Sequence, residues 1–252
     1  MSDATQTASP AERRVAIDGA SRRRLYLFRH GAVDYLDENG EWVADPDRVN
    51  LNERGRAQAE AMAGLFADVH VDKALCSGLV RTRQTGELVL GDRDVELGVF
   101  EDLEEIRPQM GQSAGGYDVY TDIAFSHWRA PEADARFLGG ERYQDFYARI
   151  CAGMDKVLAD RSWHNLALFA HGGTNAAVLG WATGVGLRAF GLLDQAMCCL
   201  NVLDFDVDDS GRLLRKTVRA MNITADDPVM RHRDAGDMEM LARRMLKSQS
   251  MA

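Results

Sequence analysis

Two short apolar runs constrain the fold of this chain most strongly, because each is closed by a histidine and a glycine. The run 25–28 leads into Arg29-His30-Gly31, and the run 166–170 leads into His171-Gly172. Continuous apolar runs of this length are typical of strands buried on both faces, as in parallel sheets. Ligands of such sheets lie beyond the carboxyl ends of the strands. We therefore expect two neighbouring strands that bring both histidines into one crevice.

Strand-like and helix-like patterns alternate along the rest of the chain, which is typical of a parallel sheet covered by helices. The predicted fold is an α/β three-layer sandwich, with a mostly parallel central sheet flanked by helices and an inserted lid segment. Strands are expected near 24–28, 73–76, 95–97 and 166–170, helices near 52–69, 79–90, 142–159 and 173–181, and a final β-hairpin near 197–206 and 213–221.

The 252 residues are sufficient for one sizeable domain. Residues 1–23 are polar and lack the apolar core of a signal peptide, so we expect a disordered tail. The domain is expected at 24–225 and a helical tail at 226–252, with its helix packed on the core. Within the domain, residues 107–140 break the pattern with glycines, prolines and scattered aromatic residues. This composition is too apolar for a linker and predicts an insertion that covers the substrate.

The formal net charge of -9 argues against nucleic acid and anionic membranes as partners. No stretch approaches the roughly 20 apolar residues that a membrane span needs. The four cysteines lack metal-ligand spacing and are interpreted as free thiols of a reducing compartment. No nucleotide-binding or metal-binding motif is present. A cytoplasmic protein without a metal site is therefore expected.

His30 is the candidate nucleophile. A lone histidine at a strand end is usually structural, but Arg29, Gly31 and the second motif at His171 favour catalysis. A neutral imidazole can attack phosphorus and form a phosphoenzyme intermediate, which divides a difficult displacement into two easier steps. Guanidinium groups nearby would oppose protonation of the ring. The pattern therefore indicates phosphoryl chemistry.

The segment 77–83 follows the second predicted strand and opens a helix, so Arg81 and Arg83 are candidates to bind a phosphoryl group. Planar guanidinium groups bind phosphate oxygens in pairs, and amide groups at a helix N-terminus, such as those after Gly172, can add to that binding. The alternative is a solvated helix face, and one of these two arginines is expected to belong to it.

Expulsion of an alkoxide also needs a proton donor. Asp102, Glu104 and Glu105 cluster after the third predicted strand, and two of the three are expected to be surface charges. His127, beside Trp128 and Arg129, either contacts the substrate or is a packed or solvent-facing residue, and the second interpretation is preferred.

With these residues identified, the chain resembles the histidine phosphatase superfamily (phosphoglycerate-mutase-like, branch one). The resemblance rests on six ordered pieces, at 25–31, 51–59, 77–85, 103–106, 139–141 and 168–174. It implies a covalent phosphohistidine on His30, a phosphate pocket completed by Arg29, Arg81 and His171, and Glu105 as the proton donor. Gly31 and Gly172 are also expected to contact the substrate. No metal or organic cofactor is implied.

The chain departs from the mutase branches at Leu36, where those members carry an asparagine that touches phosphate. The leading expectation is therefore a phosphomonoesterase acting on a small soluble phosphate ester. Phosphoglycerate-mutase-type transfer and a catalytically weak module that binds phosphate ligands are the alternatives, and a homodimer is left open. Residues 32–50 and 107–140 are expected to select the substrate. There, Arg107, Arg129, Arg136 and Arg142 either contact a second anionic group or are surface charges.

Overall fold

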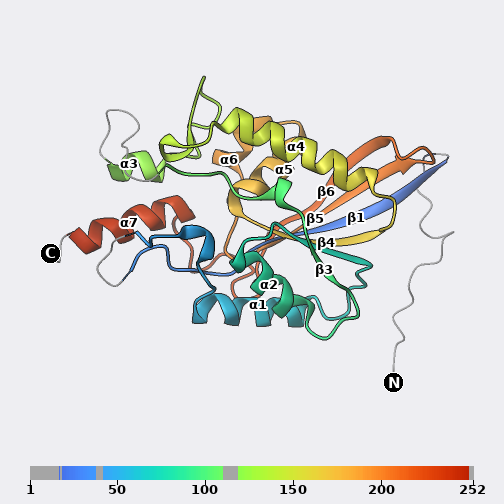
Figure 1. Cartoon of the computed structure of the whole chain (residues 1–252), viewed down its shortest axis with the longest axis horizontal. Helices are drawn as coiled ribbons and strands as arrows, with labels where there is room; N and C mark the ends of the chain where they lie inside the picture. Colours follow the sequence, from blue (N-terminus) through green and yellow to red (C-terminus); the bar gives the residue numbers. More distant parts are fainter. Residues whose placement is uncertain (1–16, 18, 38–41, 110–118, 250–252) are drawn as a thin grey trace.

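The computed structural model describes residues 17, 19–37, 42–109 and 119–249 (Figure 1). Its centre is a six-stranded sheet in the order β3-β2-β4-β1-β5-β6. The strands are β1 (Ala20–Arg29), β2 (Lys73–Cys76), β3 (Leu97–Val99), β4 (Asn165–Ala170), β5 (Leu200–Asp208) and β6 (Leu213–Ile223). The neighbours from β3 to β1 are parallel, whereas β5 runs antiparallel to β1 and β6 antiparallel to β5. The expected mostly parallel sheet is confirmed.

Helices cover both faces of this sheet, which confirms the three-layer sandwich (Figure 1). They are α1 (Glu53–Leu65), α2 (Val80–Leu90), α3 (Val119–Ala124), α4 (Tyr143–Ala159), α5 (Gly172–Thr183), α6 (Ala189–Leu192) and α7 (Asp237–Gln249). Helices α4, α5 and α6 share one apolar core with Leu25 and Leu27 of β1. Helices α1 and α2 share a second core with Phe28, because successive strand residues point to opposite faces.

The register between β1 and β4 positions the two histidine motifs. Phe28 is paired with Phe169 and Arg29 with Ala170, and the two phenyl rings stack 4.7 Å apart. Each strand then ends, so the next residue of each leaves the sheet at the same edge. The expectation that the two apolar runs are neighbouring parallel strands is confirmed.

The expected boundary of the N-terminal tail is wrong, because β1 begins at Ala20 instead of near Arg24. Residues 20–23 are charged and look like a tail, but they pair along β5. Arg22 binds Asp206 at 2.9 Å, and the buried Arg23 donates to the carbonyl oxygen of Trp163 at 3.0 Å. Residues 1–16 and 18 lie outside the described part.

The segment 107–140 is described except for residues 110–118. Helix α3 lies at its middle and a short 3-10 turn, Phe137–Gly139, near its end. Helix α3 packs against α7 near the C-terminus (Figure 1). The C-terminal helix is therefore present, but it packs against this segment as well as reaching the core through the buried Ala242. None of the helices within the described ranges is long and apolar enough to cross a membrane.

Candidate active site

His30 and His171 meet at the carboxyl ends of β1 and β4. Their ring centroids are 5.3 Å apart. The backbone of His30 is held on both sides, because its N–H donates to Ala170 O at 3.1 Å and its carbonyl accepts from Cys198 N at 2.9 Å. The structure thus brings the two histidines together as the sequence predicted.

A single hydrogen bond selects the reactive nitrogen of His30. Its Nδ1 lies 2.8 Å from Gly31 O, and a carbonyl oxygen can only accept, so Nδ1 carries the proton and Nε2 keeps its lone pair. Burial, followed by the charges of Arg81 and Arg29, lowers the pKa of His30 well below 6.5. The ring is therefore neutral near pH 7, as a nucleophile requires.

Gly31 acts through its backbone and its lack of a side chain. Its N–H donates to Thr85 Oγ1 at 3.0 Å, and its carbonyl accepts from His30. A Cβ atom here would lie 2.5 Å from Gly55 O at the start of α1, which is closer than atoms can approach. Both polar groups are thus used within the protein. Gly31 thereby positions His30, and its contact with the substrate stays a prediction.

His171 has the opposite tautomer. The Thr82 hydroxyl group donates to Leu79 O at 2.8 Å, so it accepts the hydrogen bond from the Ser77 hydroxyl group. Because the only hydroxyl hydrogen of Ser77 is used in this way, its oxygen accepts from His171 Nε2 at 2.7 Å, and Nε2 carries the proton. The Nδ1 atom of His171 is buried and has no partner. Burial, then Arg81, His30 and Arg29, lower the pKa of His171 well below 6.5. Sequence reasoning did not identify Ser77 as its partner.

Arg81 lies at the start of α2 and is buried. Its Nη1 donates to Pro46 O at 2.9 Å, and its guanidinium lies 5.7 Å from the centre of the Tyr35 ring. Its Nε atom is buried without a partner. Arg83, two residues further along the same helix, is exposed. This agrees with the expectation that one of the two arginines is solvated.

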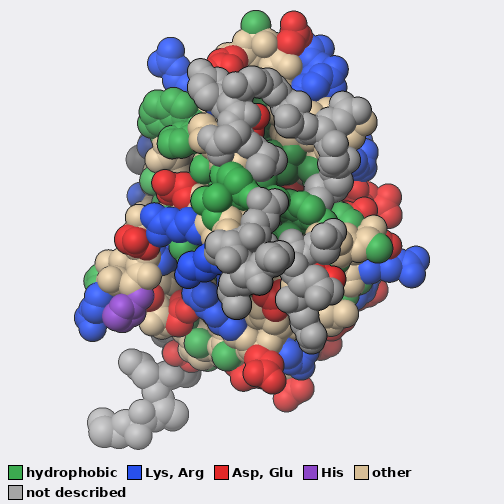
Figure 2. All heavy atoms as spheres, turned by 90° about the vertical axis from the view of Figure 1, so that its left-hand side faces the viewer, with side chains coloured by type: hydrophobic (Ala, Val, Ile, Leu, Met, Phe, Trp, Pro, Cys, Tyr) green, Lys and Arg blue, Asp and Glu red, His purple; other side chains and the backbone are tan. Residues whose placement is uncertain are grey.

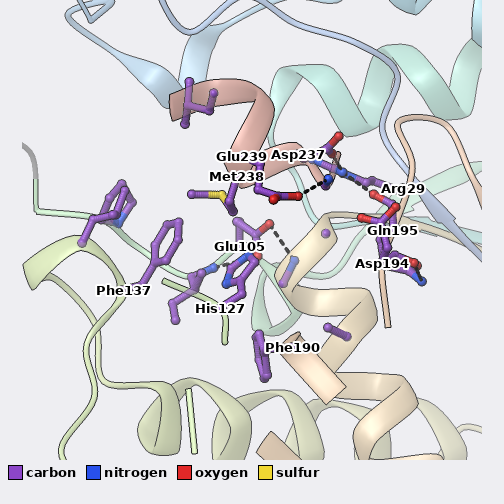
Figure 3. A pocket seen from close by; sticks show the side chains of 18 of the residues that line it. Arg29, Glu105, His127, Phe137, Phe190, Asp194, Gln195, Asp237, Met238 and Glu239 are labelled. Atoms are coloured by element: carbon purple, nitrogen blue, oxygen red, sulfur yellow. Dashed lines mark hydrogen bonds and ion pairs between the residues drawn. The ribbon is translucent and has the colours of Figure 1, made fainter. Parts of the chain in front are cut away.

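Arg29 lies against the N-terminus of α5, since a Cβ atom on Gly172 would be 3.2 Å from its Cζ. Its Nη1 donates to Gln195 O at 2.5 Å and forms an ion pair with Asp237 of α7, while its Nε is buried without a partner. Burial lowers the pKa of this guanidinium. Figure 3 shows Arg29, Gln195 and Asp237 side by side.

Gln195 is a positioning residue that no sequence pattern indicated. Its side-chain oxygen accepts from Asn201 at 2.7 Å and from Asn175 at 3.2 Å. These buried amides fix the backbone that Arg29 contacts. Asp237 was also missed, because 208 residues separate it from Arg29.

Among the three candidate acids, the structure separates Glu105 from its neighbours. Asp102 pairs with Lys156 at 2.6 Å, and Glu104 pairs with Arg107 at 3.0 Å. Glu105 instead lies at the N-terminus of α5. Its carboxylate accepts from the backbone N–H groups of Gly173 at 3.0 Å, Thr174 at 3.1 Å and Ile106 at 3.0 Å. Gly172 N–H, the first amide of that helix, makes no hydrogen bond with any described residue.

These residues open into one cavity of about 630 Å³. Its wall includes residues from the predicted insertion and from the C-terminal segment, whose contribution was not expected. Figure 2 shows apolar side chains gathered at the centre of the face that carries α3 and α7. The lining residues used below are Arg29, His30, Arg81, Glu105, Arg107, His127, Trp128, Phe137, Phe190, Leu192, Arg233 and Met238.

A family model for the histidine phosphatase superfamily (branch 1) matches residues 25–218. The chain belongs to this family. Among curated members, it is similar to a probable 2-carboxy-D-arabinitol-1-phosphatase of Arabidopsis thaliana, with 28% identity over 210 residues, 82% of this chain and 43% of the plant protein. It is also similar to an adenosylcobalamin/alpha-ribazole phosphatase of Salmonella typhimurium, with 29% identity over 152 residues, 60% of this chain and 74% of that protein.

Solved structures share the histidine phosphatase fold. The alpha-ribazole phosphatase from Shigella flexneri matches with a TM-score of 0.62 and 23% identity, covering 79% of this chain and 96% of that one. A mycobacterial glucosyl-3-phosphoglycerate phosphatase matches with a TM-score of 0.63 and 21% identity, covering 80% and 99%. The chain spans less than half the length of the plant relatives, at 43% and 44%.

Proposed function

We propose that this protein is a phosphomonoesterase that works through a phosphohistidine on His30. One observation carries the proposal. Of the seven buried side-chain atoms without a partner among the described residues, three surround His30: Arg29 Nε, Arg81 Nε and His171 Nδ1. Buried polar atoms are normally hydrogen-bonded, so a cluster of unsatisfied nitrogens indicates that their partner is a ligand. A phosphoryl group, with several acceptor oxygens and a negative charge, matches the two guanidinium groups. Its charge also favours a proton on His171 Nδ1, which can then donate to a phosphoryl oxygen.

In the first step, His30 Nε2 attacks phosphorus while the bond to the ester oxygen breaks. Arg29, Arg81, His171 and Gly172 N–H hold the phosphoryl oxygens, and Glu105 gives a proton to the departing alkoxide. In the second step, Glu105 takes a proton from water, which attacks phosphorus. The phosphorus–nitrogen bond breaks, and neutral His30 and inorganic phosphate result.

Hydrolysis is favoured over mutase-type transfer by the charges around the cavity. A mutase must hold a phosphorylated intermediate through further anionic groups and present it again. Beyond Arg29 and Arg81, the described cations that line the cavity are Arg107 and Arg233, and each is paired with a carboxylate. Leu36, in place of the asparagine of the mutase branches, forms a bridge with Trp42 instead of supplying a polar group.

The test is hydrolysis of para-nitrophenyl phosphate with orthovanadate as an inhibitor, in a chelating buffer. We expect turnover and competitive inhibition. Arg81→Ala should weaken vanadate binding by about 10- to 100-fold, the equivalent of about 1.5–3 kcal/mol for a charge-assisted hydrogen bond. Arg83→Ala, an exposed arginine of the same helix, is the matched control. Equal effects of the two substitutions, or activity lost in chelator, would contradict the proposal.

The ion pair between Arg29 and Asp237 gives a second prediction, because the carboxylate competes with a phosphoryl group for the charge of the same guanidinium. Asp237→Asn should strengthen vanadate inhibition about fivefold, since a hydrogen-bonded ion pair is worth about 1 kcal/mol. Asp145→Asn, an exposed acid on α4, is the control. Weaker inhibition by vanadate after Asp237→Asn would show that the carboxylate does not compete with the phosphoryl group.

A further inference from the structure

The cavity continues beyond Glu105 along an aromatic wall. Figure 3 shows His127, Phe137, Phe190 and Met238 grouped on this side of Glu105. The rings of His127 and Phe137 stack with centroids 5.3 Å apart and planes inclined by 17°, and Phe190 lies 5.7 Å from His127. Three side chains from different parts of the chain thus form one continuous apolar surface.

Trp128 extends this wall to the rim of the cavity. The residue is 63% exposed, yet its indole ring contacts α6 at Gly191. A Cβ atom on Gly191 would be only 2.9 Å from Trp128 Cε3, so the close contact depends on the glycine. An exposed indole held against a glycine and lining a cavity is suited to cover a flat ligand.

His127 contributes an uncharged ring to the wall. Burial lowers its pKa to about 4, so it is neutral near pH 7. Its Nδ1 is 3.0 Å from the hydroxyl group of Tyr143. Sequence reasoning preferred a packed or solvent-facing role for His127. The structure gives it both a packed side and a side that lines the cavity.

Cations that could bind a second anionic group of the substrate are already paired. Arg107 binds Glu104 at 3.0 Å, and Arg233 binds Asp194 and Asp237, each at 3.1 Å. The other arginines that the sequence offered for this purpose have partners too and do not line the cavity: Arg129 with Asp122, Arg142 with Asp134, and Arg136 with the carbonyl oxygen of Gly140. The internal segments 38–41 and 110–118 contain no lysine or arginine.

Carboxylates along the same cavity add to this effect. Asp47 and Glu239 line it, together with acids that pair with arginines, among them Asp234, which pairs with Arg243 at 3.3 Å. An anionic leaving group would lose water next to carboxylates and gain no free cation in return. Such burial of an uncompensated charge is costly, and like charges discriminate against the wrong ligand. An uncharged group avoids both costs.

We propose that the preferred substrates are phosphomonoesters of uncharged, apolar alcohols whose leaving group has the size of one or two aromatic rings. This proposal rests on the proposed function, because a phosphoryl group on His30 is what directs the leaving group into the cavity. The volume of about 630 Å³ lies within the range of small-molecule sites and accommodates such a group.

A matched pair of esters tests the proposal. Benzyl phosphate and 4-carboxybenzyl phosphate differ by one carboxylate far from the reacting oxygen, so their leaving alcohols have similar basicity. We expect kcat/KM for benzyl phosphate to be higher by about tenfold or more, which is the scale of discrimination by a pocket contact. 2-Naphthylmethyl phosphate should be at least as good a substrate as benzyl phosphate. A carboxylated ester that is equal or better would overturn the proposal.

Two variants test which cavity residues determine the preference among these esters. Trp128→Ala, at an exposed position, should lower kcat/KM for 2-naphthylmethyl phosphate by about tenfold and leave inhibition by orthophosphate unchanged. Leu192→Arg adds a cation at a lining position that is 58% exposed, and it should shift the preference towards 4-carboxybenzyl phosphate. Leu65→Ala, an exposed apolar residue of α1, is the control. Variants that keep the wild-type preference would place the leaving group elsewhere.

The two proposals fail in different ways. A protein that hydrolyses none of the three esters, nor para-nitrophenyl phosphate, would overturn the proposed function. A protein that hydrolyses them all but favours the carboxylated ester would retain the phosphomonoesterase function and lose the proposed leaving-group class.

Discussion

The two central histidines differ in which ring nitrogen faces the site. His30 uses Nδ1 to bind Gly31 O and presents Nε2, whereas His171 uses Nε2 to bind Ser77 and presents Nδ1. One hydrogen bond to the protein is enough to fix each tautomer and ring orientation. The same side chain can therefore supply a nucleophile at one strand end and a phosphoryl contact at the next.

Glu105→Gln tests the assignment of the proton donor. The amide oxygen can still accept from Thr174 and Ile106, but the amide nitrogen cannot accept from Gly173, and the amide cannot supply the proton for an alkoxide. We expect hydrolysis of alkyl phosphates to slow by about 10²- to 10⁴-fold, the usual contribution of general acid catalysis, and of activated aryl esters far less. The measurement is kcat against the pKa of the leaving alcohol. Glu101→Gln, an exposed acid nearby, is the control. A uniform slowing across all esters would exclude Glu105 as the acid.

The half-buried His127 predicts a pH dependence of stability. Its pKa is about 4 in the folded protein, and the ordinary value is 6.5. Between these values the unfolded chain binds the proton and the folded protein does not, so the free energy of unfolding falls as pH falls. The slope is about 1.4 kcal/mol per pH unit for one such histidine.

Urea unfolding between about pH 6.5 and pH 4.5 measures this slope, and His127→Gln should reduce it by up to the contribution of one histidine. The control is His70→Gln, at an exposed position. An unchanged slope in the His127 variant would show that the ring is not buried in its neutral form.

At the scale of elements, the position of His30 depends on how closely α1 approaches the end of β1. Two glycines make the contact: a Cβ atom on Gly31 would lie 2.5 Å from Gly55 O, and one on Gly55 would lie 2.1 Å from Ala32 O. The side chain of Asn52 begins the helix at this point by accepting from Gly55 N at 2.9 Å.

Two glycine substitutions in α1 should therefore have opposite effects. Gly55→Ala should destabilise the protein and reduce activity, because backbone atoms must move to admit the methyl group. Gly64→Ala, in the same helix with no atom within 4 Å of its Cβ position, should stabilise the protein by about 0.5–1 kcal/mol. Thermal unfolding and kcat/KM measure both effects. Equal stability changes would mean that the close approach does not constrain the site.

The helix at the C-terminus shows what an element pattern can and cannot predict. Apolar residues at helical spacing predicted α7, and the helix is present at Asp237–Gln249. A periodic pattern indicates that one face is covered, but not what covers it. Its contact with α3 and the ion pair from Asp237 to Arg29 arise from tertiary packing, so they could not be predicted from the sequence.

At the scale of the whole molecule, the alternation of elements was sufficient to predict the layers and the neighbouring strands β1 and β4. A continuous apolar run predicts a strand that is buried on both faces, and the glycines after it predict a turn. The start of β1 was missed because Arg22 and Arg23 satisfy their charges through Asp206 and through backbone carbonyls far along the chain. Such long-range partners leave no local pattern.

In the candidate site, too, local patterns could be predicted and long-range contacts could not. His30 and His171 could be predicted because each directly follows a buried strand, and Arg81 because it lies at the start of the helix after β2. The choice among Asp102, Glu104 and Glu105 needed the partners of each carboxylate. The unpaired nitrogens and the aromatic wall depend on side-chain packing across several elements, and only the folded structure shows them.

Identification of the covalent intermediate is the decisive test of a phosphohistidine on His30. The protein is mixed with a ³²P-labelled phosphate ester, quenched in alkali within milliseconds, and digested for mapping of the label. We expect an alkali-stable, acid-labile phosphohistidine at His30, which is lost in His30→Ala. A label on His171, or a label that persists in the His30 variant, would contradict it.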